Sequence, residues 1–256
     1  MNAELTIAAA FEEALERFSR ERPARMLASG ELNVHHYIEM LRQIYYQVRE
    51  NPQLQALAAN YFRGDDRDTV KLFFKHATQE IGHDALAKAD LEALGVNTEQ
   101  LPYEYSLPET AALTGFVTTQ IQFRSVHGYL GYLYFLEFLP TSSGAAFATA
   151  LAAVGVPKSA MTFLLEHSTV DVAHNKLMES YIRRLVHTED DLRAVVYGVR
   201  ATGALYAAML DAAISTVEEP FAYGIDPLEA RRCRPDHVRG HGDARSNSLI
   251  EEVQAA

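Results

Sequence analysis

The segment EHSTVDVAHN carries three side chains that can bind a metal ion, His167, Asp171 and His174. Each residue of an ideal helix advances about 100°, so these three fall within about 60° of one another and share one face. The same face continues through Leu164 and Met178, which predicts that it is buried. Because an unpaired buried carboxylate is costly and normally becomes neutral or binds a cation, something must compensate Asp171.

A second expected helix, over residues 68–95, shows the same pattern, because His76, Glu80 and His83 stand on one side between apolar positions. Glu80 and His83 form E-x-x-H, a spacing that lets a carboxylate and an imidazole bind one metal ion in helix bundles. A third candidate is Glu137, which lies in the apolar stretch GYLYFLEFLP. A glutamate in such a stretch needs either a metal ion or a buried basic partner.

Together these helices offer three carboxylates and three imidazoles as candidate metal ligands: Glu80, His83, Glu137, His167, Asp171 and His174. Mixed oxygen and nitrogen donors suit two iron or manganese ions, and three carboxylates would cancel most of their charge. Each motif also has a structural interpretation: a chance E-x-x-H, a His–Asp hydrogen bond in the core, and a Glu137–Arg124 ion pair. Their joint occurrence on core-facing stripes favours a metal site.

The elements that must position these ligands are helices, because apolar residues recur at spacings of three and four and strand-like alternation is absent. With 256 residues, of which 48% are hydrophobic, the chain can bury one substantial core. We therefore expect a single all-α domain over residues 1–220. Residues 221–256 are rich in Arg, Asp, His, Gly and Ser, which predicts a loosely ordered tail. A helix over residues 110–139, ended by Pro140, should carry Glu137.

The charge balance and the cysteine content restrict the classes of function. The 34 acidic and 23 basic side chains give a formal net charge of −11, which repels nucleic acid and anionic membranes and favours a small-molecule substrate. Cys233 is the single cysteine, which excludes an internal disulfide. The start of the chain lacks the basic and apolar pattern of a signal peptide, and no apolar run suggests a membrane span. These features predict a cytoplasmic protein.

The order of the ligands resembles that of the haem-oxygenase-like di-metal oxidases and oxygenases, often described as iron-containing redox enzymes. In that superfamily a carboxylate and a histidine on one helix precede a glutamate on the next long helix and an H-x3-(D/E)-x2-H motif on a later one. The stretches HYIEMLRQIYYQVRENP and GYLYFLE are similar to the early helix and to the region around the second carboxylate. The resemblance covers residues 34–213, and the spacing between the first carboxylate and its histidine differs among members.

The resemblance implies an up-down bundle of about seven or eight helices, usually a homodimer, with two Fe2+ ions per chain and O2 as co-substrate. Manganese is an alternative metal, and the second metal site of the superfamily can be labile. Glu80 and Glu137 are expected to bridge or chelate the ions, and Asp171 to close the second site. A reductant or redox partner is implied but is not identified by any motif.

Family members act on amino acids by N-hydroxylation, desaturation, C–C cleavage or ring formation, and on fatty acids by decarboxylation or desaturation. We expect a small carboxylate, with an amino acid as first choice and a fatty acid if the cavity is long and apolar. A metal-independent enzyme of the same fold, thiaminase-like or similar to pyrroloquinoline-quinone synthase, is a second alternative. Cys233 lies in the tail, which weighs against a thiaminase mechanism.

Residues on the ligand-bearing faces are expected to line the substrate pocket: His76, Gln120, Phe123, Arg124, His127, Tyr134 and Tyr181. His76 is expected to donate a hydrogen bond to a ligand or to cap the pocket. Arg124 is a candidate for a two-pronged contact with a substrate carboxylate, although it can equally pair with an acid of the protein. Tyr181 can donate a hydrogen bond to the pocket or simply pack in the core.

Overall fold

The computed structural model describes residues 2–62 and 66–219, with all of their side chains except those of residues 168–174. Within these ranges every regular element is a helix, which confirms the all-α class. The α-helices are α1 (Ala3–Arg20), α2 (Arg22–Ser29), α3 (Val34–Val48), α4 (Asn51–Ala59), α5 (Arg67–Glu80), α6 (His83–Ala93), α7 (Pro108–Thr119), α8 (Val126–Ala153), α9 (Thr162–Leu185) and α10 (Glu189–Glu218). The boundary expected at residue 220 stays a prediction, because the following residues lie outside the described ranges.

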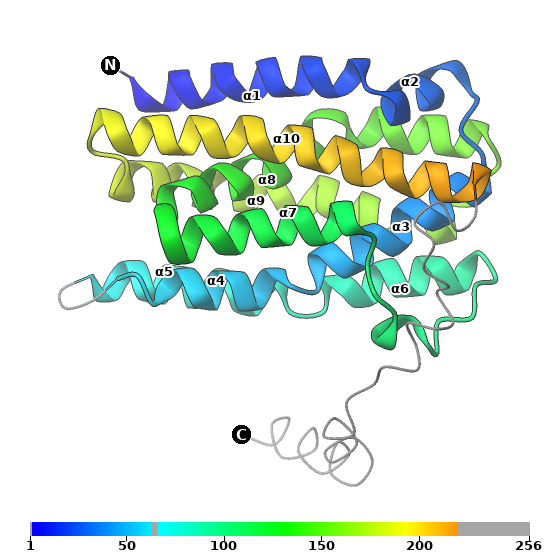
Figure 1. Ribbon diagram of the computed structural model, residues 1–256, viewed down its shortest axis with the longest axis horizontal. Helices are drawn as coiled ribbons and strands as arrows, with labels where there is room; N and C mark the ends of the chain where they lie inside the picture. Colours follow the sequence, from blue (N-terminus) through cyan, green and yellow to red (C-terminus); the bar gives the residue numbers. More distant parts are fainter. Residues whose placement is uncertain (1, 63–65, 220–256) are drawn as a thin grey trace, which may run out of the picture.

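The long helices form a bundle (Figure 1), with α1 and α10 along one side and α4 and α5 along the other. Helix α8 packs against both α9 and α10, and α10 also packs against α1 and α3. The core lies between these helices and is built of aliphatic and aromatic side chains. Among the described residues, no helix is both long and apolar enough to cross a membrane.

The prediction of one continuous helix over residues 68–95 is wrong, because the chain breaks between α5 and α6. Ile81 is extended, with φ −65° and ψ 120°, and Gly82 adopts a φ of 98°. Glycine enters this left-handed region at little cost because it has no Cβ. The break places Glu80 at the end of one helix and His83 at the start of the next, so the E-x-x-H motif spans a corner.

The helix expected over residues 110–139 is also divided. After α7 the chain makes one π-helical turn over Gln120–Arg124 (η2), and at Ser125 it becomes extended, with a φ of −157°. The hydroxyl of Ser125 accepts a hydrogen bond from the backbone N–H of His127 and caps α8. In contrast to the prediction, α8 continues through Pro140. A proline inside a helix costs about 3 kcal/mol, which the packing of α8 against two neighbouring helices offsets.

Helices α8 and α10 cross with their backbones in direct contact. A Cβ on Gly131 would lie 2.3 Å from the carbonyl oxygen of Val195, and one on Gly198 would lie 2.2 Å from the carbonyl oxygen of Gly128. Only glycine leaves room for this approach, because real Cβ atoms do not come so close to backbone oxygen. The crossing therefore fixes the position of α8, which carries Glu137.

We expect Gly198→Ala to destabilise the protein by about 1–3 kcal/mol, because the added methyl group forces α8 and α10 apart. Gly115→Ala in α7 is the matched control, since a Cβ there meets no atom within 4 Å. That variant should be stabilised by about 0.5–1 kcal/mol, because alanine restricts the unfolded chain. Denaturant unfolding measures both changes, and equal stability of the two variants would contradict the close crossing.

Candidate metal centre

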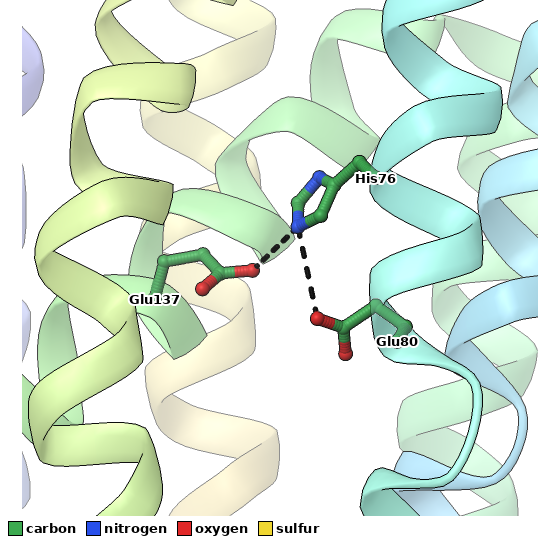
Figure 2. Close-up of side chains that lie close together, drawn as sticks. All are labelled: His76, Glu80 and Glu137. Atoms are coloured by element: carbon green, nitrogen blue, oxygen red, sulfur yellow. Dashed lines mark hydrogen bonds and ion pairs between the residues drawn. The ribbon is translucent and has the colours of Figure 1, made fainter.

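Two glutamates and a histidine meet inside the bundle (Figure 2). His76 and Glu80 lie one turn apart on α5, and Glu137 points toward them from α8. Nε2 of His76 is 3.1 Å from Oε1 of Glu137 and 3.7 Å from Oε1 of Glu80. One ligand atom from each of the three residues lies within 4.8 Å of the others. At this separation the three side chains could bind one metal ion together.

The centre is buried and holds two carboxyl groups. His76 is 0% exposed, Glu80 5% and Glu137 8%. Among the residues that the structure describes, no lysine or arginine is buried. The alternative that Arg124 neutralises Glu137 does not hold, because Arg124 is exposed. A divalent cation would balance the two carboxylates, and the oxygen and nitrogen donors fit iron or manganese.

The histidines keep Glu80 ionised. Burial raises the pKa of Glu80, but the hydrogen bond and the charge of His83, with a contribution from His76, bring that pKa below its ordinary value. Nδ1 of His83 lies 3.4 Å from Oε2 of Glu80, across the corner between α5 and α6. A carboxylate must be ionised to bind a metal ion, so this environment favours the form of Glu80 that binds.

His167 on α9 is held in the form that binds a metal ion. Its Nδ1 lies 2.7 Å from the carbonyl oxygen of Phe163, which can only accept, so the ring proton is on Nδ1 and Nε2 keeps its lone pair. Burial lowers the pKa of His167, and the nearby His83 lowers it further. The rings of His83 and His167 are 4.6 Å apart, which joins α9 to the centre.

The structure thus brings together four of the six ligands expected from the sequence, Glu80, His83, Glu137 and His167. The side chains of Asp171 and His174 lie outside the described residues, and their role stays a prediction. His76 was expected to assist a ligand or to cap the pocket, but its ring nitrogen stands directly between the two glutamates. The sequence signal for this role was the spacing of four residues between His76 and Glu80, which places both side chains on the same face of one helix.

Of the residues expected in the pocket, Tyr181 borders the centre. It is buried, and its ring lies 6.1 Å from that of His76. Tyr134 instead packs against Phe138, with 4.2 Å between ring centroids, and against Phe11 of α1. The prediction that Tyr134 lines the substrate pocket is therefore wrong, because Tyr134 faces α1 rather than the candidate ligands.

Three further residues expected in the pocket, Phe123, Arg124 and His127, lie around the break at Ser125 and do not face the centre. Phe123 is 74% exposed and Arg124 is also exposed, so neither lines a cavity. Nε2 of His127 lies 2.8 Å from the carbonyl oxygen of Leu185 at the end of α9.

Gln120 is buried, but it packs against the backbone of α8. A Cβ on Gly128 would lie 2.5 Å from Oε1 of Gln120. This contact places Gln120 at the start of α8, more than two helical turns before Glu137. The expectation that Gln120 faces the substrate is therefore also corrected.

Sequence reasoning missed an apolar cavity of about 90 Å³ that reaches His167. This is several times the roughly 10–15 Å³ that one water molecule needs. Five helices contribute its lining residues: Phe18, Tyr37, Met40, Leu41, Ile44, Leu139, Pro140, Ser143, Gly144, Phe147, Phe163, Leu164, His167, Tyr206 and Leu210. Within any single helix these residues resemble ordinary core positions, so no local pattern distinguishes them.

Comparison with solved structures shows the fold. A domain of unknown function with a heme oxygenase-like fold from Shewanella denitrificans is 20% identical, with a TM-score of 0.76 over 88% of this chain and 95% of that chain. A TenA homologue from Pyrococcus furiosus is 15% identical, with a TM-score of 0.67 over 83% of this chain and 100% of that chain. A TenA homologue from Pseudomonas syringae pv. tomato is 15% identical, with a TM-score of 0.69 over 84% and 93%. The architecture is therefore haem-oxygenase-like.

Comparison of the sequence with known proteins and with family models identifies the family. No curated protein matches the chain significantly. Residues 38–207 match the model of a family described as iron-containing redox enzyme, and this range includes α5, α8 and α9. Because the match covers well over half of the chain, the protein belongs to the iron-containing redox enzyme family.

Proposed function

We propose that the protein is a non-haem di-iron oxidase or oxygenase that uses O2 to oxidise a carboxylate-bearing substrate with an apolar body. The observation that carries this proposal is the pair of buried glutamates, Glu80 and Glu137, which meet at His76 with no buried lysine or arginine among the described residues. Two buried carboxylates this close together cannot both stay ionised without a cation, and one bound ion would satisfy both. Membership of the iron-containing family makes iron the first choice.

Each described ligand has a distinct task in this proposal. Glu80 and Glu137 would hold the metal from opposite helices, and the neutral ring of His167 would bind through Nε2. Bound ferrous iron would supply electrons for the reduction of O2. Burial of the centre excludes water and keeps the carboxylates free of competing solvent contacts. Two ions per chain, manganese as an alternative, the reductant and the homodimer stay predictions.

The cavity favours the fatty-acid alternative over an amino acid. Among the described residues that line it there is no lysine, arginine, aspartate or glutamate. The ammonium group of an amino acid would lose its water there without gaining a partner, which is costly. An alkyl chain would instead gain from contact with side chains such as Leu41 and Phe147. We therefore expect a fatty acid whose carboxylate would bind the metal ion at the His167 end of the cavity and whose chain fills the cavity.

A metal-independent enzyme of the same fold remains the competing hypothesis, because two of the similar structures are TenA homologues. The fold by itself does not decide between these chemistries. In that case His76 and Glu137, 3.1 Å apart, would serve as an acid–base pair. Metal binding by the purified protein separates the two hypotheses.

We expect anaerobic titration with Fe2+ to show tight binding that Glu137→Gln weakens by more than about tenfold, because the amide removes a charged oxygen ligand. Glu39→Gln is the matched control, since Glu39 is a partly buried glutamate of α3 that pairs with Arg42 and lies outside the centre. Its affinity should equal that of the wild type. Wild-type affinity in the Glu137→Gln variant would contradict the assignment of the centre.

We expect O2 uptake by the iron-loaded protein to rise with saturated fatty acids and not with amino acids. Leu41→Phe should shift the preferred chain length downward, because the larger ring occupies part of the cavity. Leu5→Phe makes the same change at a side chain that is 68% exposed and should leave the preference unaltered. An oxygen electrode measures the uptake, and stimulation by amino acids alone would favour the first choice made from the sequence.

A further inference from the structure

A chain of buried polar side chains leads from the interior of the bundle to the metal centre. It consists of Gln47 on α3, Asn51 at the start of α4 and Tyr132 on α8, and all three are buried. Buried polar groups are costly unless they are hydrogen-bonded, and here they bond to one another. The proposed chemistry uses none of them, which raises the question of what they do.

The hydrogen bonds of this chain converge on the side-chain amide of Asn51. The hydroxyl of Tyr132 donates to Oδ1 of Asn51 over 2.8 Å. Nε2 of Gln47 donates to the same oxygen over 3.2 Å and also donates to the hydroxyl of Tyr132. Nδ2 of Asn51 in turn donates to Oε2 of Glu80 over 3.4 Å.

These contacts are consistent with one orientation of the amide. Tyr132 and Gln47 both present donors to the oxygen of Asn51, so its NH2 group must point the other way, toward Glu80. Oε2 of Glu80 accepts the hydrogen bond from this NH2 group, which agrees with this orientation. Because the groups are buried, each of these hydrogen bonds acts in a low dielectric, and reversal of the Asn51 amide would place its oxygen against a carboxylate oxygen of Glu80.

The consequence is that the two oxygens of Glu80 have different surroundings. Oε2 faces Asn51 and His83, each at 3.4 Å, whereas Oε1 faces His76 on the side of Glu137. Glu80 is the last residue of α5, and the backbone leaves the helix immediately after it. A ligand at such an end lacks the packing of a following helical turn, so its side chain depends on contacts from other helices.

We infer that Asn51, oriented by Tyr132 and Gln47, is a positioning residue that holds Oε2 of Glu80 and so directs Oε1 into the metal centre. The inference rests on the proposed function, because it assumes that Glu80 binds the ion. The competing explanation is that the three side chains only stabilise the packing of α3 and α4 against α8. The two explanations differ in what happens to the metal site when a hydrogen bond is removed.

The test is anaerobic titration with Co2+, followed by its visible absorption spectrum, which reports the ligand geometry. We expect Asn51→Ala and Tyr132→Phe each to weaken Co2+ binding by about 10–100-fold and to change the spectrum. The double variant should bind no more weakly than Asn51→Ala, because Tyr132 acts through Asn51. If Asn51→Ala does not fold, Tyr132→Phe still tests the inference, because it removes only one oxygen atom.

Tyr129→Phe is the matched control. Tyr129 lies on the same helix as Tyr132, is equally buried, and has its ring 5.9 Å from that of Tyr132. Its hydroxyl has no hydrogen-bond partner among the described residues, so its removal should leave the affinity and the spectrum unchanged. The inference fails if Tyr132→Phe and Asn51→Ala lower the unfolding temperature but bind Co2+ as the wild type does. A wild-type protein that binds no Co2+ would instead refute the metal centre itself, and the inference with it.

Discussion

The structure depends on the meeting of Glu80 and Glu137 in an apolar interior. Two carboxylates of like charge repel each other there far more strongly than in water, and the only described cation candidates beside them are histidine rings. Burial raises the pKa of Glu80, but His83 and His76 bring it below its ordinary value, which favours the ionised form that binds a metal ion. A metal ion bound between them would resolve this conflict, and α5 and α8 are the helices that would hold it.

Backbone features rather than side-chain packing alone bring the ligands together. The glycine crossing of α8 and α10 at Gly131 and Gly198 fixes the helix that carries Glu137. The corner at Gly82 separates Glu80 from His83 and lets the two side chains meet across it at 3.4 Å. Both features are sites where a Cβ is excluded or strained, which explains why glycine occupies them. The centre is thus supported by elements that tolerate little change.

The apolar cavity and the metal centre share His167, so substrate and metal would meet at one residue. The haem-oxygenase-like fold is common to proteins of different chemistry, and it explains the bundle rather than the reaction. This chain combines buried carboxylates with a cavity whose described lining residues carry no Lys, Arg, Asp or Glu. The proposal of iron rests on the first feature, and the proposal of an alkyl substrate rests on the second.

The sequence by itself determined the helical class and indicated that Glu80 and Glu137 are buried, because helical periodicity and a lone Glu137 in an apolar stretch are local signals. It did not predict the breaks at Gly82 and Ser125, since a single glycine or serine within a periodic pattern is compatible with a continuous helix. Those breaks decided that Arg124 points to solvent and that the E-x-x-H motif spans a corner. The tertiary structure also decided the cavity and the place of His76, because both arise only where several helices converge and no local pattern records which faces will meet.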